Sequence, residues 1–390
     1  MANSQDNPPP VEHAPTSAQG RVSLLLFGVS LALFAASGLM FYLAKPPERR
    51  TEAFHRGFTP LTRDWTPENC WVPDPEVEHN LAPGADFTAP NDQGVLVRYQ
   101  AVPVGQGGVC FRDNGIRGPV FAVAVGDSFT FGHGVALEDC WVARLEAAAN
   151  ADVVNLGVSN IFGSTQYLRT LTRHGLPLHP KVVVWATFVN DWLDDTLFNA
   201  WYELSRTLGR QIEFPRSRPI YDAIRGNAYV LPDEPGTFPP LDQKQSYASD
   251  GLRFTFDATA YAVQDLRFAA VSAGRASSEK ALLEAKSAAL AGGAAFVVVV
   301  IPAKEHVYHR RVTQVVEYAR TQDPAVYCNA TTAFCRERGI PCLDLLPVLT
   351  ERADRGEQLY FAEDGHFNVA GNRVAAEAIE RFLKEHGLMP

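Results

Sequence analysis

Residues 121–134, "FAVAVGDSFTFGHG", combine an apolar strand with a polar turn. Five apolar residues run into Gly-Asp-Ser and then into small residues that permit a tight bend. A continuous apolar run of this length is typical of a strand buried on both faces. The sequence therefore places the hydroxyl of Ser128 at the mouth of a buried strand, where a helix should begin.

Further apolar runs follow, separated by segments with helical periodicity. The predicted strands lie in residues 119–128, 152–160, 180–191, 294–303 and 340–346, and the predicted helices in 139–150, 164–175, 277–293, 324–339 and 368–387. Apolar strands that alternate with helices indicate a parallel sheet covered on both faces. We expect an α/β domain over residues 120–390, built on a flavodoxin-like doubly wound parallel sheet of about five strands.

One connection in this domain is much longer than the others. Residues from about 192 to 274 are rich in aromatic and turn residues. Most connections between elements of a compact domain are only a few residues long. We interpret this region as an inserted lid or substrate-binding subregion.

The N-terminal part of the chain differs in character from the α/β domain. Residues 1–21 are rich in Pro, Asn and Ser and are predicted to be a disordered tail. Residues 22–44 contain no charged side chain, and 23 residues of helix would cover roughly 34 Å, enough to cross a bilayer core. We predict a single transmembrane helix there. Residues 45–119 then form a juxtamembrane segment and an N-terminal extension with a few short strands.

The composition excludes several classes of protein. The net charge is -9 over 390 residues, which disfavours a nucleic-acid partner. The six cysteines form no paired Cys-x-x-Cys pattern, so they are either buried thiols or disulfides, and zinc is not expected. The glycine-rich residues 105–108 precede no helix and are not a phosphate loop. We expect neither a metal nor a cofactor.

Polar residues follow several of the predicted strands. Ser128 ends the first strand, Gly157 follows the second, and Asn190 follows the third. His366 and Asp364 precede the last helix. Because the carboxyl ends of parallel strands meet at one edge of a sheet, we expect these residues to converge. A nucleophile, an imidazole, a carboxylate and hydrogen-bond donors are the groups that serine acyl transfer needs.

These motifs resemble those of the SGNH, or GDSL-type, hydrolase superfamily, over residues 114 to the C-terminus. The resemblance implies that Ser128 is the nucleophile and His366 the base. It also implies an oxyanion hole formed by the N–H groups of Ser128 and Gly157 and the amide of Asn190. The residues before the first strand are similar to those of membrane-anchored bacterial members.

Two positions depart from the usual superfamily pattern. Phe188 stands where a Gly is usual in the third block, and Glu363 stands where the Asp of the last block is usual. The Asp-x-His spacing of Asp364 and His366 is similar to that of the alginate O-acetylation branch. We therefore assign Asp364 as the residue that orients His366, with Glu363 as the alternative.

Other polar residues near these motifs receive structural roles. Asp127 is expected to satisfy backbone N–H groups of the turn, and Asp191 is left out of the catalytic set. His133 is expected to be solvated or packed, and Lys304 to lie at the surface.

The resemblance implies a serine esterase or O-acyltransferase, with acetyl groups of a polysaccharide or another glycan as the expected substrate. A lipase or thioesterase of the same superfamily, or a glycan-binding relative without activity, stays open. Hydrolysis and transfer are not distinguished, and protein partners are unknown. Basic residues are more numerous after the predicted span than before it, which favours a cytoplasmic domain. Acylated polysaccharides and disulfides favour the periplasm instead. We expect a single-pass inner-membrane protein whose catalytic domain is periplasmic.

Overall fold

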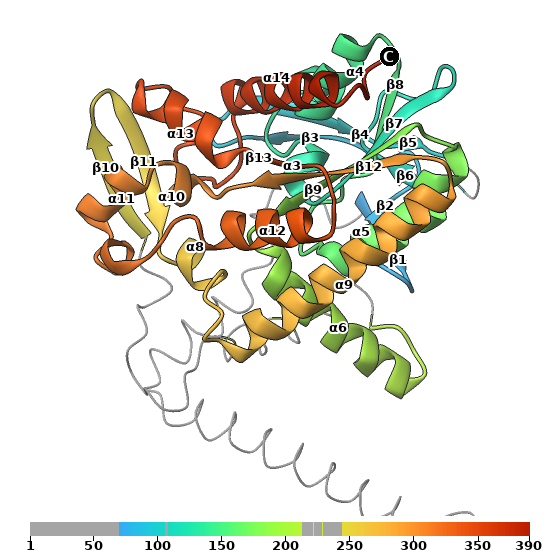
Figure 1. Ribbon diagram of the computed structural model, residues 1–390, viewed down its shortest axis with the longest axis horizontal. Helices are drawn as coiled ribbons and strands as arrows, with labels where there is room; N and C mark the ends of the chain where they lie inside the picture. The colour runs from blue at the N-terminus through green and yellow to red at the C-terminus, as the bar shows by residue number, and fades with distance from the viewer. Residues whose placement is uncertain (1–69, 106–107, 213–220, 222–227, 229–243) are drawn as a thin grey trace, which may run out of the picture. The chain divides into compact units, whose positions relative to one another are not determined.

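The computed structural model describes residues 70–105, 108–212, 221, 228 and 244–390 (Figure 1). The centre of the described chain is a parallel sheet of five strands, which lie in the order β13-β12-β9-β7-β8. The strands are β7 (Val120–Val125), β8 (Asp152–Asn155), β9 (Val182–Phe188), β12 (Ala295–Ile301) and β13 (Cys342–Asp344). This is the flavodoxin-like strand order. The predicted five-stranded parallel α/β sheet is confirmed.

The strands are buried because their side chains face two hydrophobic layers. All six residues of β7 are buried. Val123 and Val125 belong to the core cluster on one face, whereas Ala122 and Ala124 belong to the cluster on the other. Neighbouring side chains of a strand point to opposite faces. An unbroken apolar run is therefore what a doubly covered sheet requires.

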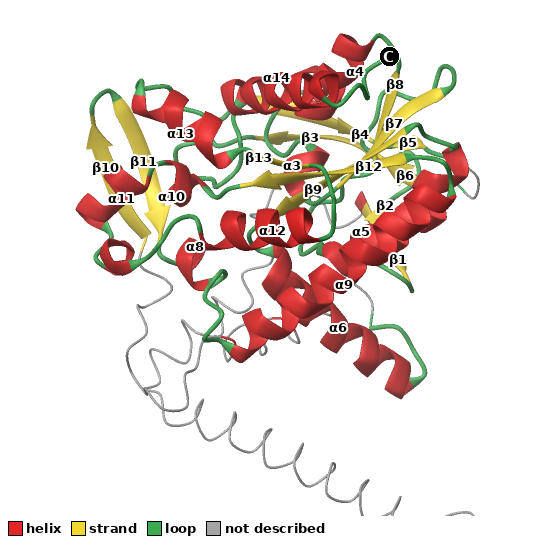
Figure 2. Cartoon of the chain, in the orientation of Figure 1, coloured by secondary structure: helices red, strands yellow, loops and turns green. Residues whose placement is uncertain are grey.

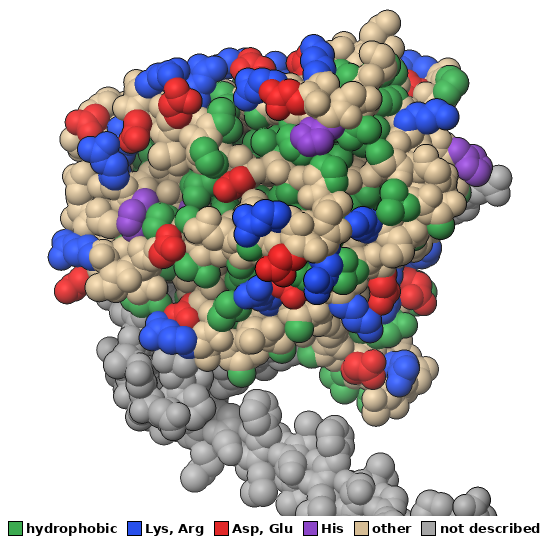
Figure 3. All heavy atoms as spheres, viewed as in Figure 1, with side chains coloured by type: hydrophobic (Ala, Val, Ile, Leu, Met, Phe, Trp, Pro, Cys, Tyr) green, Lys and Arg blue, Asp and Glu red, His purple; other side chains and the backbone are tan. Residues whose placement is uncertain are grey.

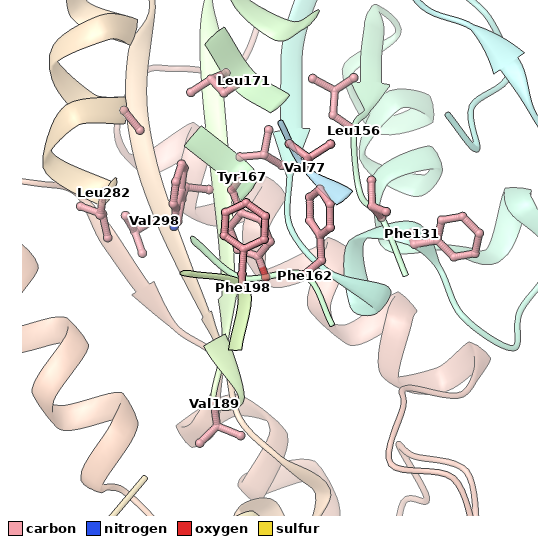
Figure 4. Close-up of a cluster of buried hydrophobic side chains, with 14 of the residues drawn as sticks. Val77, Phe131, Leu156, Phe162, Tyr167, Leu171, Val189, Phe198, Leu282 and Val298 are labelled. Atoms are coloured by element: carbon pink, nitrogen blue, oxygen red, sulfur yellow. The ribbon is translucent and has the colours of Figure 1, made fainter. Parts of the chain in front are cut away.

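Helices supply both hydrophobic layers (Figure 2). One layer contains side chains of α5 (Ser164–Thr170), α6 (Asp191–Leu208), α9 (Ala269–Ala291) and α12 (Val326–Glu337). The other contains side chains of α4 (Trp141–Ala149), α13 (Leu346–Asp354) and α14 (Val369–Glu385). Figure 4 shows part of the first layer, where Tyr167, Phe198 and Leu282 are brought together from three different helices.

Two helices differ in extent from the prediction. Helix α9 begins at Ala269 rather than near residue 277. Residues 269–276 are rich in Ala, which favours helix. It packs closely on α6 at Gly274, where a Cβ would lie 1.4 Å from the carbonyl oxygen of Trp192. Helix α5 ends at Thr170, and a π-helical turn, η4 (Leu171–Gly175), completes the segment predicted as helix.

Short strands precede the α/β domain. They are β1 (Trp71–Asp74), β2 (Glu78–Leu81), β3 (Asp86–Pro90), β4 (Leu96–Gln100), β5 (Val102–Pro103) and β6 (Cys110–Phe111). Four of them form an antiparallel sheet in the order β1-β2-β6-β5, and β3 and β4 form a hairpin. Tyr99 of β4 and Phe131 stack with ring centroids 5.8 Å apart, so this extension packs directly beside the turn that carries Ser128.

The region predicted as an insertion contains several elements. Its first residues belong to α6, whose Leu197 and Trp201 are buried in the core. Later residues form the hairpin β10 (Lys244–Ser249) and β11 (Leu252–Asp257) and the short helix α8 (Thr259–Ala262). Figure 1 shows this hairpin beside α10 (Lys304–Val307) and α11 (His309–Val315), at the edge where β12 ends. Most of residues 213–243 lie outside the described residues.

The remaining short helices connect the larger elements. They are α3 (Ser128–Phe131), η3 (Leu137–Asp139), η5 (Leu176–Leu178) and η6 (Tyr318–Thr321). The face shown in Figure 3 carries acidic and basic side chains interspersed with one another.

The predicted tail and transmembrane helix, residues 1–44, lie outside the described residues. Within the part of the chain that the structure describes, no helix combines the length and the apolar character that crossing a membrane would need.

Candidate active site

Ser128 is the first residue of α3 and follows directly on the turn after β7. Asp127 caps the helix: its Oδ1 accepts a hydrogen bond of 2.9 Å from the N–H of Phe129. Gly126 is required for the close approach of this turn to the sheet, because a Cβ there would lie 2.8 Å from the carbonyl oxygen of Ala186. The turn thus places the hydroxyl of Ser128 at the carboxyl edge of the sheet.

The structure brings Ser128, His366 and Asp364 into one hydrogen-bonded chain. Nε2 of His366 lies 2.6 Å from Oγ of Ser128, and Nδ1 of His366 lies 2.5 Å from Oδ1 of Asp364. The same Oδ1 accepts a hydrogen bond of 2.7 Å from the backbone N–H of His366. Asp364 rather than Glu363 therefore makes the contact with the imidazole.

The charges in this hydrogen-bonded set suit His366 to act as a general base. Burial lowers the pKa of His366, but the adjacent Asp364 carboxylate more than offsets this, so the pKa lies above its usual value. Burial raises the pKa of Asp364, but its bonds to the imidazoles hold that pKa well below its usual value. Asp364 is ionised and accepts from Nδ1–H, which leaves Nε2 of His366 to accept the hydroxyl proton of Ser128.

Two further acids lie in a buried polar network beneath the nucleophile. Burial raises the pKa of Asp127 to about 6, and burial together with the charge of Asp127 raises the pKa of Asp191 well above its usual value. Asp191 accepts hydrogen bonds from the hydroxyls of Tyr167, at 2.7 Å, and Thr187, at 2.6 Å. These contacts give both acids structural roles, in line with the sequence-based interpretation.

Gly157 does not present a free N–H to the site. Its N–H donates to Oδ1 of Asn155 at 2.9 Å, and the amide of Asn155 donates to the carbonyl oxygen of Thr130 at 2.8 Å. A Cβ on Gly157 would lie 2.3 Å from the backbone nitrogen of Phe131. In this structure the glycine serves close packing of the turn after β8 against α3. Its predicted part in the oxyanion hole has no support from its hydrogen bonding.

Asn190 lies at the end of β9 and lines a cavity of about 240 Å³ beside the catalytic chain. Its Nδ2 donates to Oδ2 of Asp194 at 2.8 Å. A carboxamide nitrogen carries two hydrogens, so a second N–H is left for a ligand. The backbone N–H of Ser128 is the other predicted donor of this site.

The Phe at position 188 is accommodated without left-handed backbone geometry. Its ring lies against that of Phe129, with centroids 4.4 Å apart, and its N–H donates to Oδ2 of Asp191 at 3.2 Å. The departure from the usual glycine therefore adds an apolar wall to the cavity without displacing Asn190.

Lys304 lies differently from the sequence-based interpretation, whereas His133 is packed, which is one of the two expectations for it. Lys304 is buried rather than exposed, and its Nζ donates to the carbonyl oxygens of Ala362, at 3.1 Å, and Asp364, at 3.0 Å. Burial lowers the pKa of Lys304. His133 is buried and its ring stacks on that of His366.

Asp92, in the turn between β3 and β4, was not singled out. Its carboxylate accepts hydrogen bonds from the N–H groups of three consecutive residues at 2.8–3.2 Å: Ala362, Glu363 and Asp364. The N-terminal extension thereby holds the loop that carries Asp364. No local motif around Asp92 distinguishes it, because its partners lie about 270 residues further along the chain.

His133, Asp364 and His366 place possible metal-ligand atoms within 4.8 Å of one another. These atoms are already paired: each carboxylate oxygen of Asp364 faces one imidazole, and Nε2 of His366 faces Ser128. We interpret the cluster as a hydrogen-bonded catalytic set. A larger groove of about 610 Å³, lined by Glu138, Glu146 and Asp152, lies where β8 begins and includes none of the predicted site residues.

The fold of the described α/β domain is SGNH hydrolase-like. Residues 261–389 match the family model described as the SGNH hydrolase-like domain of the acetyltransferase AlgX. That match covers the loop of Asp364 and His366 and ends before the C-terminus, while Ser128 lies outside it. None of the curated proteins that were compared matches the sequence.

Several solved structures match part of the chain. One is a protein assigned to the lipolytic G-D-S-L family from Desulfitobacterium hafniense, with 16% identity and a TM-score of 0.37, covering 68% of this chain and 99% of that one. Another is a GDSL-like lipase from Bacteroides thetaiotaomicron, with 10% identity and a TM-score of 0.34, covering 68% of this chain and 88% of that one. At these scores the two structures support no inference about substrate or activity.

Proposed function

We propose that the protein is a serine esterase or O-acyltransferase acting on ester-linked acyl groups. The observation that carries this proposal is the continuous chain from Oγ of Ser128 through His366 to Asp364, with contacts of 2.6 and 2.5 Å. An imidazole held at Nδ1 by a carboxylate and at Nε2 by a hydroxyl is the arrangement that activates a serine nucleophile.

The reaction proceeds in two halves. Oγ of Ser128 attacks the ester carbonyl while its proton passes to Nε2 of His366, and the carbonyl oxygen becomes an oxyanion facing the Ser128 N–H and the Asn190 amide. His366 then returns the proton to the departing alcohol as the ester bond breaks, which leaves an acyl group on Ser128. In the second half, the oxygen of water or of a sugar hydroxyl attacks the acyl carbonyl while its proton passes to His366. The bond between the acyl group and Oγ then breaks, and His366 returns that proton to Oγ of Ser128.

A short acyl group is the substrate that the site favours. The cavity beside Asn190 has a volume of about 240 Å³ and is walled in part by Phe188. The match to the acetyltransferase AlgX domain supports acetyl groups of a polysaccharide as the specific case.

Labelling with a fluorophosphonate probe tests whether the protein is a serine enzyme. We expect stoichiometric labelling of the native protein, no labelling of Ser128→Ala, and slow labelling of His366→Ala. Labelling of the Ser128→Ala variant at the native rate, or none of the native protein, would contradict the proposal and favour a binding protein.

A panel of p-nitrophenyl esters of increasing acyl length distinguishes the possible substrates. We expect kcat/KM to fall steeply beyond the acetyl and propionyl esters. A maximum at long chains would favour a lipase or thioesterase. Adding a soluble glycan and measuring acetylated sugar against free acetate then separates transfer from hydrolysis.

The cellular location is proposed from the sequence. We propose that residues 22–44 anchor the protein in the inner membrane with the catalytic domain in the periplasm. Protease digestion of intact spheroplasts tests this: the domain should be cleaved. Protection until the membrane is broken would place the domain in the cytoplasm.

A further inference from the structure

His133 lies in a loop that is held closely in one conformation. It stands between Gly132 and Gly134, whose φ angles of 81° and 76° lie in the left-handed region. A Cβ on Gly134 would lie 2.6 Å from the ring of Phe361, so the loop fits only with glycine there. The N–H of His133 donates to the carbonyl oxygen of Ser128 at 3.1 Å, which ties the loop to the nucleophile turn.

The N-terminal extension fixes the same loop from its other side. The buried guanidinium of Arg112 donates to the carbonyl oxygens of Phe131, at 3.1 Å, of Val135, at 2.6 Å, and of Gly132. The hydroxyl of Tyr99 accepts from the N–H of Gly134 at 2.9 Å. These contacts hold the backbone on both sides of His133 in place.

In that position His133 contacts both the proposed base, His366, and the carboxylate of Asp364 that holds it. Its ring stacks on that of His366, with centroids 4.0 Å apart and an interplanar angle of 10°. Its Nε2 lies 3.4 Å from Oδ2 of Asp364, while Oδ1 of the same carboxylate faces His366. Asp364 is therefore held between two imidazoles, one at each oxygen.

His133 remains neutral at the pH of activity. Burial, together with the adjacent charge of His366, lowers the pKa of His133 to about 3, although Asp364 opposes this shift and Arg112 adds to it. A neutral imidazole carries one N–H, and Nε2 of His133 lies 3.4 Å from Oδ2 of the ionised Asp364, so an N–H at Nε2 faces that carboxylate. The other charged groups that face His366 are Asp127 and Lys304.

We propose that His133 is a positioning residue, a neutral second imidazole that fixes the Asp364 carboxylate and holds the ring of His366 in line with Ser128. This inference rests on the proposed function, because it assumes that His366 acts as the base for Ser128. The resulting arrangement is Ser128–His366–Asp364–His133. In it, His133 does not touch the substrate and acts only by positioning His366 and Asp364.

Three substitutions separate the contributions of His133. His133→Phe keeps a flat ring but removes the N–H donor, and His133→Gln keeps a donor of similar reach but removes the ring. His174→Phe is the matched control, because His174 is also a buried histidine but lies in η4, against Phe111. Thermal unfolding of each variant shows whether it is folded.

The test has two measurements, the pH profile of Ser128 labelling by fluorophosphonate and the titration of His366 by NMR. Losing the donor leaves Asp364 more basic, so His133→Phe should raise the pKa of His366 and slow labelling below neutral pH by about 10- to 100-fold. His133→Gln should restore most of the native His366 titration, and His174→Phe should leave both measurements native. In the native protein, His133 should show no titration above pH 5.

A folded His133→Phe variant with the native labelling profile and the native His366 titration would overturn the proposal. So would a His133 that titrates near neutral pH. If the native protein is not labelled at all, the proposed function fails, but the NMR titration of His366 still reports whether His133 acts on the His366–Asp364 pair.

Discussion

Oγ of Ser128 and Nε2 of His366 lie 2.6 Å apart, although the two residues are 238 positions apart in the chain. Ser128 follows the first strand of the parallel sheet, and His366 lies in the loop before the last helix. Both reach the carboxyl edge of the sheet, where a doubly wound fold collects its ligand-binding residues. The proposed chemistry depends on this contact.

The contact between Asp364 and His366 predicts different outcomes for two neighbouring acids. Asp364→Asn should lower kcat by roughly 10⁴-fold, because the imidazole loses the carboxylate that fixes its tautomer. Glu363→Gln should leave kcat near the native value, because the Glu363 side chain makes no described contact with His366. Steady-state hydrolysis of p-nitrophenyl acetate measures both. Equal losses in the two variants would show that the carboxylate assignment is wrong.

Asn190 is predicted to stabilise the transition state rather than the fold. Asn190→Ala should lower kcat by about 10²- to 10³-fold, or about 2.7–4 kcal/mol, as for the loss of one oxyanion-hole donor. Asn199→Ala is the control: Asn199 lies in α6, the helix that Asn190 precedes, bonds Ser277 at 3.1 Å, and its loss should leave the activity native. If Asn190→Ala only raised KM and left kcat unchanged, Asn190 would not be part of the oxyanion hole.

Asp92 is predicted to organise the loop of Asp364 from outside the α/β domain. Asp92→Ala leaves three backbone N–H groups without their acceptor, which should destabilise the protein by about 1–3 kcal/mol and lower kcat as well. Asp86→Ala, which removes an exposed ion pair with Arg98 in the same hairpin, should change neither measurably. Chemical denaturation and ester hydrolysis on both variants provide the comparison, and identical behaviour would refute this role.

The pH dependence of the activity follows from the two shifted groups. The base must be neutral, and the pKa of His366 is raised above its usual value near 6.5. The rate should therefore increase with pH through a midpoint above 6.5 and then level off. The pKa of Asp364 is held well below its usual range, so protonation of Asp364 should cause no further fall in the rate above pH 4. A midpoint of kcat/KM below 6 would mean that another group controls the reaction.

Much of this arrangement was predictable because it depends on local patterns. The apolar runs of β7, β9 and β12 show strands buried on both faces, and parallel strands bring their carboxyl ends together whatever the loops contain. That rule places Ser128 and Asn190 at one edge, and the resemblance to the superfamily's last block adds His366. The resemblance of the Asp-x-His spacing to the alginate O-acetylation branch favoured Asp364, with Glu363 kept as the alternative.

The remaining features depend on contacts between distant segments. Gly157 seemed available as a donor, but Asn155, two residues earlier, takes its N–H. The burial of Lys304 and the role of Asp92 both depend on where the loop of Asp364 folds back against other elements. His133 was expected to be packed or solvated, and only the fixed loop shows that its ring faces His366.

The central claim is that Ser128 carries the acyl group between donor and acceptor. Mass spectrometry of the protein, quenched within the first turnovers of p-nitrophenyl acetate hydrolysis, tests it directly. We predict a mass increase of one acetyl group, located on the peptide that contains Ser128 and missing from Ser128→Ala. Turnover of the ester by Ser128→Ala at the native rate, or an acetyl group on a different residue, would contradict the account.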